Sequence, residues 1–151
     1  MRRILNYRKV LGVSETTELK ELKTVYRNLM KDWHPDKFQD QPEAQQGAEE
    51  KSKKIIEAYH FLVSIAPETH TQNRDAYTET TSNTGIIDFE YKAEILSISF
   101  LDGTIYEYYG VPKAIYVKLV NAETPARFAR RHIFHSYVYR SLSKQVAAVG
   151  V

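Results

Sequence analysis

The sequence predicts two modules, an all-α helical hairpin followed by a small α+β domain with an antiparallel sheet and two helices. In the first half, apolar residues recur every three or four positions, which is the period of an amphipathic helix. Later the pattern changes to the two-residue alternation of a half-buried strand, with Asp102-Gly103 as a turn signal. We therefore expect modules at residues 1–66 and 86–143, a polar Thr-rich linker at 67–85 and a tail at 144–151.

The composition sets outer limits on function. With 151 residues, 42% hydrophobic and 26% charged, the chain is ordinary globular material for one domain or two small ones. It has no cysteine, which excludes a disulfide framework and a thiolate zinc site. The basic start lacks a long apolar core, and no apolar run approaches membrane-spanning length. These features predict a soluble cytoplasmic protein with no membrane partner.

Three helices are expected in the first module. Residues 7–13 form a short packing helix that Gly12 ends, and the Ser and Thr residues that follow can cap the next helix. The second helix runs from Thr17 to about Trp33, because Pro35 disfavours helical torsions at the residue before it. Its buried stripe consists of Leu19, Leu22, Tyr26, Leu29 and Trp33. The third helix, which should lie antiparallel to the second, buries Ala48, Ser52, Ile55, Tyr59 and Leu62.

A polar loop and a basic stripe form the first candidate site. The stripe runs beside the buried face of the second helix and consists of Lys20, Lys23, Arg27 and Lys31. Such a stripe is either an ordinary solvated face or a binding surface. At its end, His34 and Asp36 are held on a loop stiffened by Pro35, with no serine or cysteine nucleophile nearby. The residues are suited to hydrogen bonding with a partner, so we expect a contact site rather than a catalytic one.

Four motifs in this module occur in a recognisable order. They are Tyr7-Arg8-Lys9-Val10-Leu11-Gly12-Val13-Ser14, Tyr26-Arg27-Asn28-Leu29, His34-Pro35-Asp36 and Glu57-Ala58-Tyr59. Over residues 5–66 the sequence thus resembles the J domain of DnaJ-type co-chaperones. The resemblance implies a J-domain hairpin that binds a DnaK-type heat-shock chaperone and stimulates its ATP hydrolysis. By position, it assigns the chaperone contact to His34, Pro35, Asp36, Lys23, Arg27 and Lys31.

The sequence departs from that family at several positions. Thr24, Asn28 and Asp32 stand where members often have Lys or Arg, which implies a weaker or more selective chaperone contact. Ser52 stands where the family usually buries a Phe, so we expect a looser core or a neighbour that fills the gap. The Gly/Phe-rich region and the Cys-rich zinc domain of full-length DnaJ are not found in this sequence. We therefore expect a J domain attached to a different module.

The second module should be a small sheet with two helices. Residues 86–91 form a strand, and Leu96, Ile98 and Phe100 alternate with serines in the next. Asp102-Gly103 makes a two-residue hairpin turn into a strand at 105–109. Two helices open at Pro112 and Pro125, and residues 137–142 close the sheet.

The order of short motifs in this module resembles the KTSC domain, which is named for its occurrence at the C-terminus of some lysyl-tRNA synthetases. The motifs are Tyr106-Glu107-Tyr108, Gly110-Val111-Pro112, Arg127-Phe128-Ala129-Arg130-Arg131-His132-Ile133 and Tyr137. The resemblance covers residues 86–142 and suggests RNA binding only as a hypothesis. Tyr106 and Tyr108 share one side of their strand, which we expect to face the helices and the core.

The C-terminal stretch carries the second candidate site. From Thr124 onward it has no carboxylate, and its basic residues are Arg127, Arg130, Arg131, Arg140 and Lys144. These residues are either an ordinary solvated face or a phosphate-facing patch for nucleic acid, with Tyr137 available to stack on a base. His132 and His135 lack further ligands for a metal.

The sequence as a whole predicts a co-chaperone adaptor. Its J domain binds a DnaK-type chaperone, and its KTSC module targets the complex. The alternative is an RNA-binding or ribonucleoprotein-associated protein in which the J-like half is a scaffold without chaperone stimulation. Neither interpretation makes the chain an enzyme or requires a cofactor or a small-molecule substrate, because no nucleophile-base pair, phosphate loop or metal site is found.

Overall fold

The computed structural model describes residues 2–142, so Lys144 and the expected tail at 144–151 lie outside the described residues. Within that range the chain divides into two compact units, residues 2–69 and 70–142. The first is all α-helical, and the second combines a four-stranded antiparallel sheet with helices, which confirms the predicted fold class. None of the helices in residues 2–142 has the length and apolar character needed to cross a bilayer.

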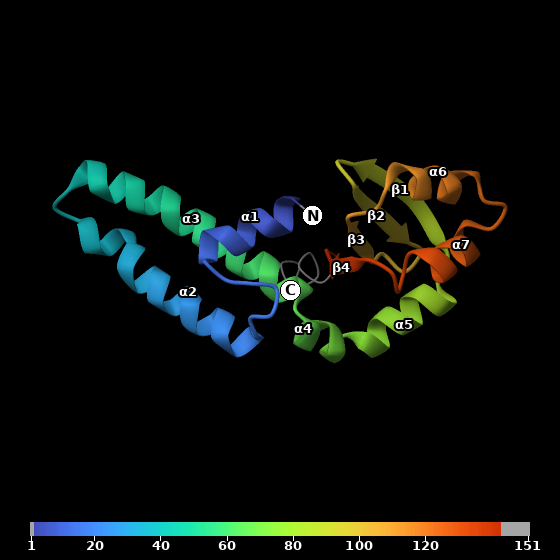
Figure 1. Ribbon diagram of the computed structural model, residues 1–151, viewed down its shortest axis with the longest axis horizontal. Coiled ribbons are helices and arrows are strands. Elements are labelled where there is room, and N and C mark those ends of the chain that lie inside the picture. Colours follow the sequence, from blue (N-terminus) through green and yellow to red (C-terminus); the bar gives the residue numbers. More distant parts are fainter. Residues whose placement is uncertain (1, 143–151) are drawn as a thin grey trace. The chain divides into compact units, whose positions relative to one another are not determined.

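The first unit is a helical hairpin with a short helix packed beside it. Its elements are α1 (Arg2–Leu11), α2 (Leu19–Trp33), the 3-10 helix η1 (Pro35–Phe38) and α3 (Pro42–Ile65). Figure 1 shows α2 and α3 running side by side, with α1 against α3. The core is made by residues that face inward from the three helices, among them Ile4, Leu11, Leu22, Ile55, Ala58, Phe61 and Leu62.

The helix ends follow the predicted chemistry in part. Gly12 adopts φ 70°, and the Val13 amide donates to the Arg8 carbonyl (3.0 Å), which ends α1 in the way that a glycine allows. The prediction that a Ser or Thr side chain caps α2 is wrong. Glu18 occupies the cap position without a side-chain bond, and the Leu19 amide donates instead to Glu68 Oε2 (2.8 Å). A carboxylate at this end also suits the helix dipole.

Ser52 is buried in the first core with its polar group satisfied. It is 5% exposed, and its hydroxyl donates to the Glu49 carbonyl one turn earlier (2.9 Å). The position therefore carries no orphaned hydroxyl, although a serine fills less volume than the phenylalanine that is usual in J domains.

The expected polar linker is wrong, because residues 67–85 contain two helices. They are α4 (Pro67–Gln72) and α5 (Arg74–Asn83). Tyr77 of α5 is buried in the core of the second unit, and Thr81 is buried with its hydroxyl donating to the Tyr77 carbonyl (2.9 Å). A single aromatic anchor and internally bonded threonines thus allow a polar stretch to pack as a helix.

The sheet of the second unit has the order β1-β2-β3-β4 with antiparallel neighbours throughout. Its strands are β1 (Ile86–Lys92), β2 (Ile95–Phe100), β3 (Ile105–Tyr109) and β4 (Val138–Ser141). The helices α6 (Lys113–Asn121) and α7 (Pro125–His132) contribute Leu119 and Ala129 to the same core as Leu96 and Tyr108, so they cover one face. Figure 1 shows both helices beside the sheet.

The sheet has two hairpin turns, of which only the one between β2 and β3 was predicted. Between β2 and β3 the loop has three residues, because Phe100 and Thr104 close it with a backbone bond (2.9 Å) and Gly103 adopts φ 88°. This is a turn followed by a left-handed residue, not the expected two-residue turn. Between β1 and β2 the two-residue turn is Ala93-Glu94, both at positive φ (52° and 64°), a conformation that favours Asn and Gly.

Tyrosines organise the second core, as predicted for Tyr106 and Tyr108. Both are buried on the helix-covered face. The Tyr77 hydroxyl donates to the Phe134 carbonyl (2.7 Å) and lies 2.9 Å from the Tyr108 hydroxyl. The ring of Tyr139 is stacked between Tyr77 and His70, with centroids 4.0 and 4.1 Å away. These contacts fix α5 to the sheet.

Candidate functional site

The loop that follows α2 has the backbone that its proline demands. His34 adopts φ −64° and ψ 131°, an extended conformation that stops the helix at Trp33. Pro35 then opens the short helix η1, and the Lys37 amide donates to the His34 carbonyl (3.0 Å). The loop is therefore ordered by its own backbone bonds.

The side chain of His34 is hydrogen-bonded within the loop. The Asp36 amide donates to His34 Nδ1 (3.2 Å), so Nδ1 is an acceptor and the ring proton lies on Nε2. His34 Nδ1 is also 3.5 Å from Asp36 Oδ2, a distance that makes an ion pair only when the ring is protonated. With side chains 51% and 75% exposed, the pair offers a partner one N–H donor and one carboxylate acceptor.

Aromatic contacts hold the loop and α2 against α3. Lys51 Nζ lies over the Trp33 indole, 4.0 Å from the ring centroid, next to the loop. Farther along the hairpin, the rings of Tyr26 and Tyr59 are stacked at 4.1 Å. The loop therefore follows a helix that packs against α3 through two aromatic contacts, one next to the loop and one farther away.

The basic side chains of α2 form an exposed face beside this loop. Lys23, Arg27 and Lys31 are all exposed, whereas Leu22 is buried against the core. Asp32 is exposed as well and reduces the positive charge next to the loop. The structure therefore brings together the residues assigned to the chaperone contact on one helix and the loop that ends it, with Pro35 half-buried.

Only some of the residues predicted for the second candidate site lie together on one exposed surface. Arg127, Arg130 and Arg131 are exposed on α7, where their spacing places them on one face opposite the buried Ala129. Three guanidinium groups on one helix face can meet phosphates.

Arg140 and Tyr137 do not join these arginines in an exposed patch. Arg140 is buried (8% exposed), and its Nη1 lies 4.0 Å from Glu107 Oε1 on the adjacent strand. It alternates with Tyr139, which faces the helices, so Arg140 faces the other side of the sheet. Tyr137 is half-buried against the core. The prediction that Arg140 belongs to an exposed basic patch is therefore wrong.

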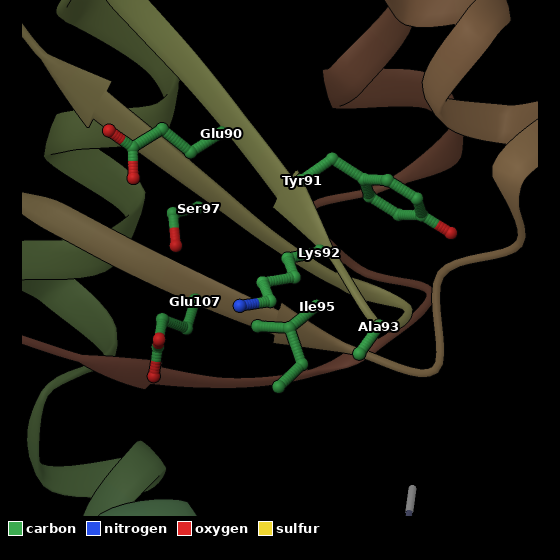
Figure 2. A pocket seen from close by; sticks show the side chains of 7 residues that line it. All are labelled: Glu90, Tyr91, Lys92, Ala93, Ile95, Ser97 and Glu107. Carbon is green, nitrogen blue, oxygen red and sulfur yellow. The ribbon is translucent and has the colours of Figure 1, made fainter.

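A cavity that the sequence did not reveal lies on the side of the sheet opposite α6 and α7. Its volume is about 390 Å³. Figure 2 shows Glu90, Ser97 and Glu107 on three neighbouring strands beside Lys92 and Ile95, with Tyr91 directed away toward the helices. The alternation of side chains along each strand predicts which residues share this face. The cavity itself depends on how the strands pair, which the alternation does not determine.

Comparison with known proteins identifies two regions. A family profile described as the DnaJ domain matches residues 6–77, and one described as the KTSC domain matches residues 80–137. Chaperone protein DnaJ of Thermoplasma acidophilum is 40% identical over 84 residues, which are 56% of this chain and 20% of that protein. DnaJ homolog subfamily C member 16 of Pongo abelii is 39% identical over 77 residues, 51% of this chain and 9% of that protein.

A further relative is similar over a shorter stretch. Chaperone protein DnaJ of Halothermothrix orenii is 46% identical over 57 residues, 38% of this chain and 14% of that protein. The chain therefore spans a fifth or less of the length of these curated relatives.

Proposed function

The chain contains a DnaJ domain at residues 6–77 followed by a KTSC domain at residues 80–137, and from this premise we propose that it is a co-chaperone adaptor. Its DnaJ domain binds a DnaK-type heat-shock chaperone in the cytoplasm and stimulates that partner's ATP hydrolysis. Its KTSC domain directs the complex to a target. The ATP chemistry belongs to the partner, and this chain supplies contacts.

The observation that carries this proposal is the exposed pair His34 and Asp36 at the end of an exposed cationic helix face. The positive charges of Lys23, Arg27 and Lys31 attract an acidic chaperone surface and orient the encounter. The Nε2–H of His34 and the carboxylate of Asp36 then complete hydrogen bonds with the chaperone, and Pro35 holds them at a fixed spacing. This division assigns affinity to the helix and stimulation to the loop.

Binding of the ATP-state chaperone to the full chain tests the helix directly. We expect the double variant Lys23→Glu/Arg27→Glu to bind about tenfold more weakly or worse, because two favourable charge contacts become repulsive. Lys53→Glu on α3 is the matched control, since Lys53 is also an exposed lysine of the hairpin. Equal affinities for the wild type and the double variant would remove α2 from the contact.

A specific observation favours RNA binding as a second candidate function. Arg127, Arg130 and Arg131 share one exposed face of α7. In this alternative the DnaJ-like half serves as a scaffold. It predicts that RNA binds more weakly as salt rises and that Arg130→Glu/Arg131→Glu abolishes binding, whereas Lys118→Glu on α6 does not. RNA affinity unchanged in the arginine variant would exclude α7 as the binding face.

A further inference from the structure

Strand β1 lies at an edge of the sheet. Among the described residues it pairs only with β2, and at seven residues it is the longest of the four strands. A strand in this position presents backbone N–H and C=O groups along its outer side, which can pair with an added strand. Within β1 the Phe89 amide donates to the Asp88 carboxylate (2.8 Å), a local bond that an added strand would replace.

The face of β1 opposite α6 and α7 is charged. Asp88, Glu90 and Lys92 are exposed there, whereas Phe89 and Tyr91 pack toward the helix-covered core. An extended segment added beside β1 places every second side chain next to these three charges. Complementary pairing therefore requires basic residues opposite Asp88 and Glu90 and favours an acidic residue opposite Lys92.

The cavity of about 390 Å³ begins at this edge and extends across the sheet. Glu90 pairs with Ser97, and Ser97 pairs with Glu107, so these side chains form one row across three strands. Glu107 is already engaged by the Tyr109 hydroxyl, which donates to its Oε1 at 2.5 Å, and by Arg140. The exposed carboxylate of Glu90 thus lies at the entrance of the row, and the Lys92 side chain lines the cavity beside Ser97.

We propose that the edge of β1 binds an extended, basic segment of a partner protein as a fifth strand, with an arginine or lysine side chain paired with Glu90 at the mouth of the cavity. Backbone bonds to β1 supply affinity, and the charges of Glu90 and Asp88 select the segment. This inference specifies the kind of target that the KTSC domain binds, and it rests on the targeting function proposed above.

Binding of a labelled peptide to the full chain, followed by fluorescence anisotropy, tests this inference. The probe has arginines at the two positions that fall opposite Asp88 and Glu90, a glutamate at the position opposite Lys92 and threonines between them, so its charged side chains fall on one side when it is extended. One comparison peptide has glutamate in place of arginine, and another has a central proline, which removes an amide and cannot continue the ladder. We expect only the arginine peptide without proline to bind well.

Variants of the chain identify the surface. We expect Glu90→Lys to weaken the arginine peptide by about tenfold or more and to favour the glutamate peptide instead. Glu123→Gln, which alters an exposed carboxylate of the same unit away from β1, should leave both affinities unchanged.

Three results would overturn the inference. They are equal binding of the proline peptide, an unchanged peptide preference in Glu90→Lys, and self-association of the chain through β1, seen by sedimentation, that excludes the peptide. Because these measurements contain no chaperone, and chaperone stimulation is measured without peptide, failure of this inference is distinct from failure of the proposed co-chaperone function.

Discussion

His70 is a half-buried titratable residue of the second unit. Its ring stacks on Tyr139, and its Nε2 lies 2.7 Å from the Tyr139 carbonyl, which requires the proton on Nε2. Burial lowers the pKa of His70, and the hydrogen bond to the Tyr139 carbonyl opposes this shift. The folded state therefore prefers the neutral ring.

This preference predicts a pH dependence of stability. An unfolded histidine has a pKa of about 6.5, and the folded value is lower, so the unfolded chain binds more protons near that pH. The stabilisation is fully present above about pH 6.5 and is lost as the pH falls toward the folded pKa. We expect the free energy of unfolding of the second unit, measured in urea, to decrease between about pH 7 and pH 5.5.

The variant His70→Gln keeps a polar side chain but cannot titrate. Its unfolding free energy should vary less over the same pH range than that of the wild type. A pH dependence that is identical in the two proteins would show that His70 does not contribute to it.

Among the secondary structure elements, the β1–β2 turn is under conformational strain. Ala93 and Glu94 both adopt positive φ, where residues with a Cβ are disfavoured by about 1 kcal/mol each. The Val111 amide donates to the Glu94 carbonyl (3.0 Å), a backbone contact that helps to hold this turn and does not depend on the side chain.

Replacement of this turn by the preferred residues should therefore stabilise the second unit. We expect Ala93→Asn/Glu94→Gly to raise its unfolding free energy by about 1 kcal/mol, measured by chemical denaturation. Gly103→Ala, at φ 88°, is the opposite control and should destabilise the same unit. Loss of stability in the Asn-Gly variant would contradict the assignment of strain to this turn.

The elements that the sequence predicted well are those with a clear period. The helical stripe of Leu22 and Tyr26 and the alternation of Leu96 with Ile98 placed α2 and β2 correctly. The β1–β2 turn was not predicted because Ala93-Glu94 contains no turn-forming residue. Helix α5 was missed because Tyr77 is its one aromatic anchor, and its burial depends on residues more than 30 positions away.

In the candidate sites, too, local features were predicted correctly and features that depend on tertiary packing were not. The loop of His34 to Asp36 was predictable because proline acts on its immediate neighbours. Arg140 was misplaced because sequence proximity to other arginines does not determine the side of a strand. The alternation of Tyr139 and Arg140 required opposite sides, but only the packing of Tyr139 decides which side is covered by helices.

For the molecule as a whole, the region that matches the DnaJ domain overlaps the second compact unit along the chain. The DnaJ match extends to residue 77, but the compact unit that contains the sheet begins at His70 and buries Tyr77 in its core. Loss of a buried aromatic side chain costs about 3–5 kcal/mol, which is a large part of the stability of a small domain. Helix α5 is therefore a structural part of the second unit.

Truncation tests this overlap. We expect residues 70–151 to unfold cooperatively on heating and to give dispersed NMR spectra, whereas residues 86–151 should not fold. In the longer fragment, Tyr77→Ala should also prevent folding. Thr78→Ala, at an exposed position of the same helix, should leave the fragment folded. A folded fragment beginning at residue 86 would show that α5 is dispensable.

The central claim is that this chain stimulates a DnaK-type chaperone through the loop that follows α2. Single-turnover ATP hydrolysis by such a chaperone, measured with the intact protein and with His34→Gln, tests it most directly. We expect the wild type to accelerate hydrolysis and the variant, which changes an exposed side chain and should remain folded, to lose the acceleration. Absence of stimulation by the folded wild type, or equal stimulation by His34→Gln, would contradict the account.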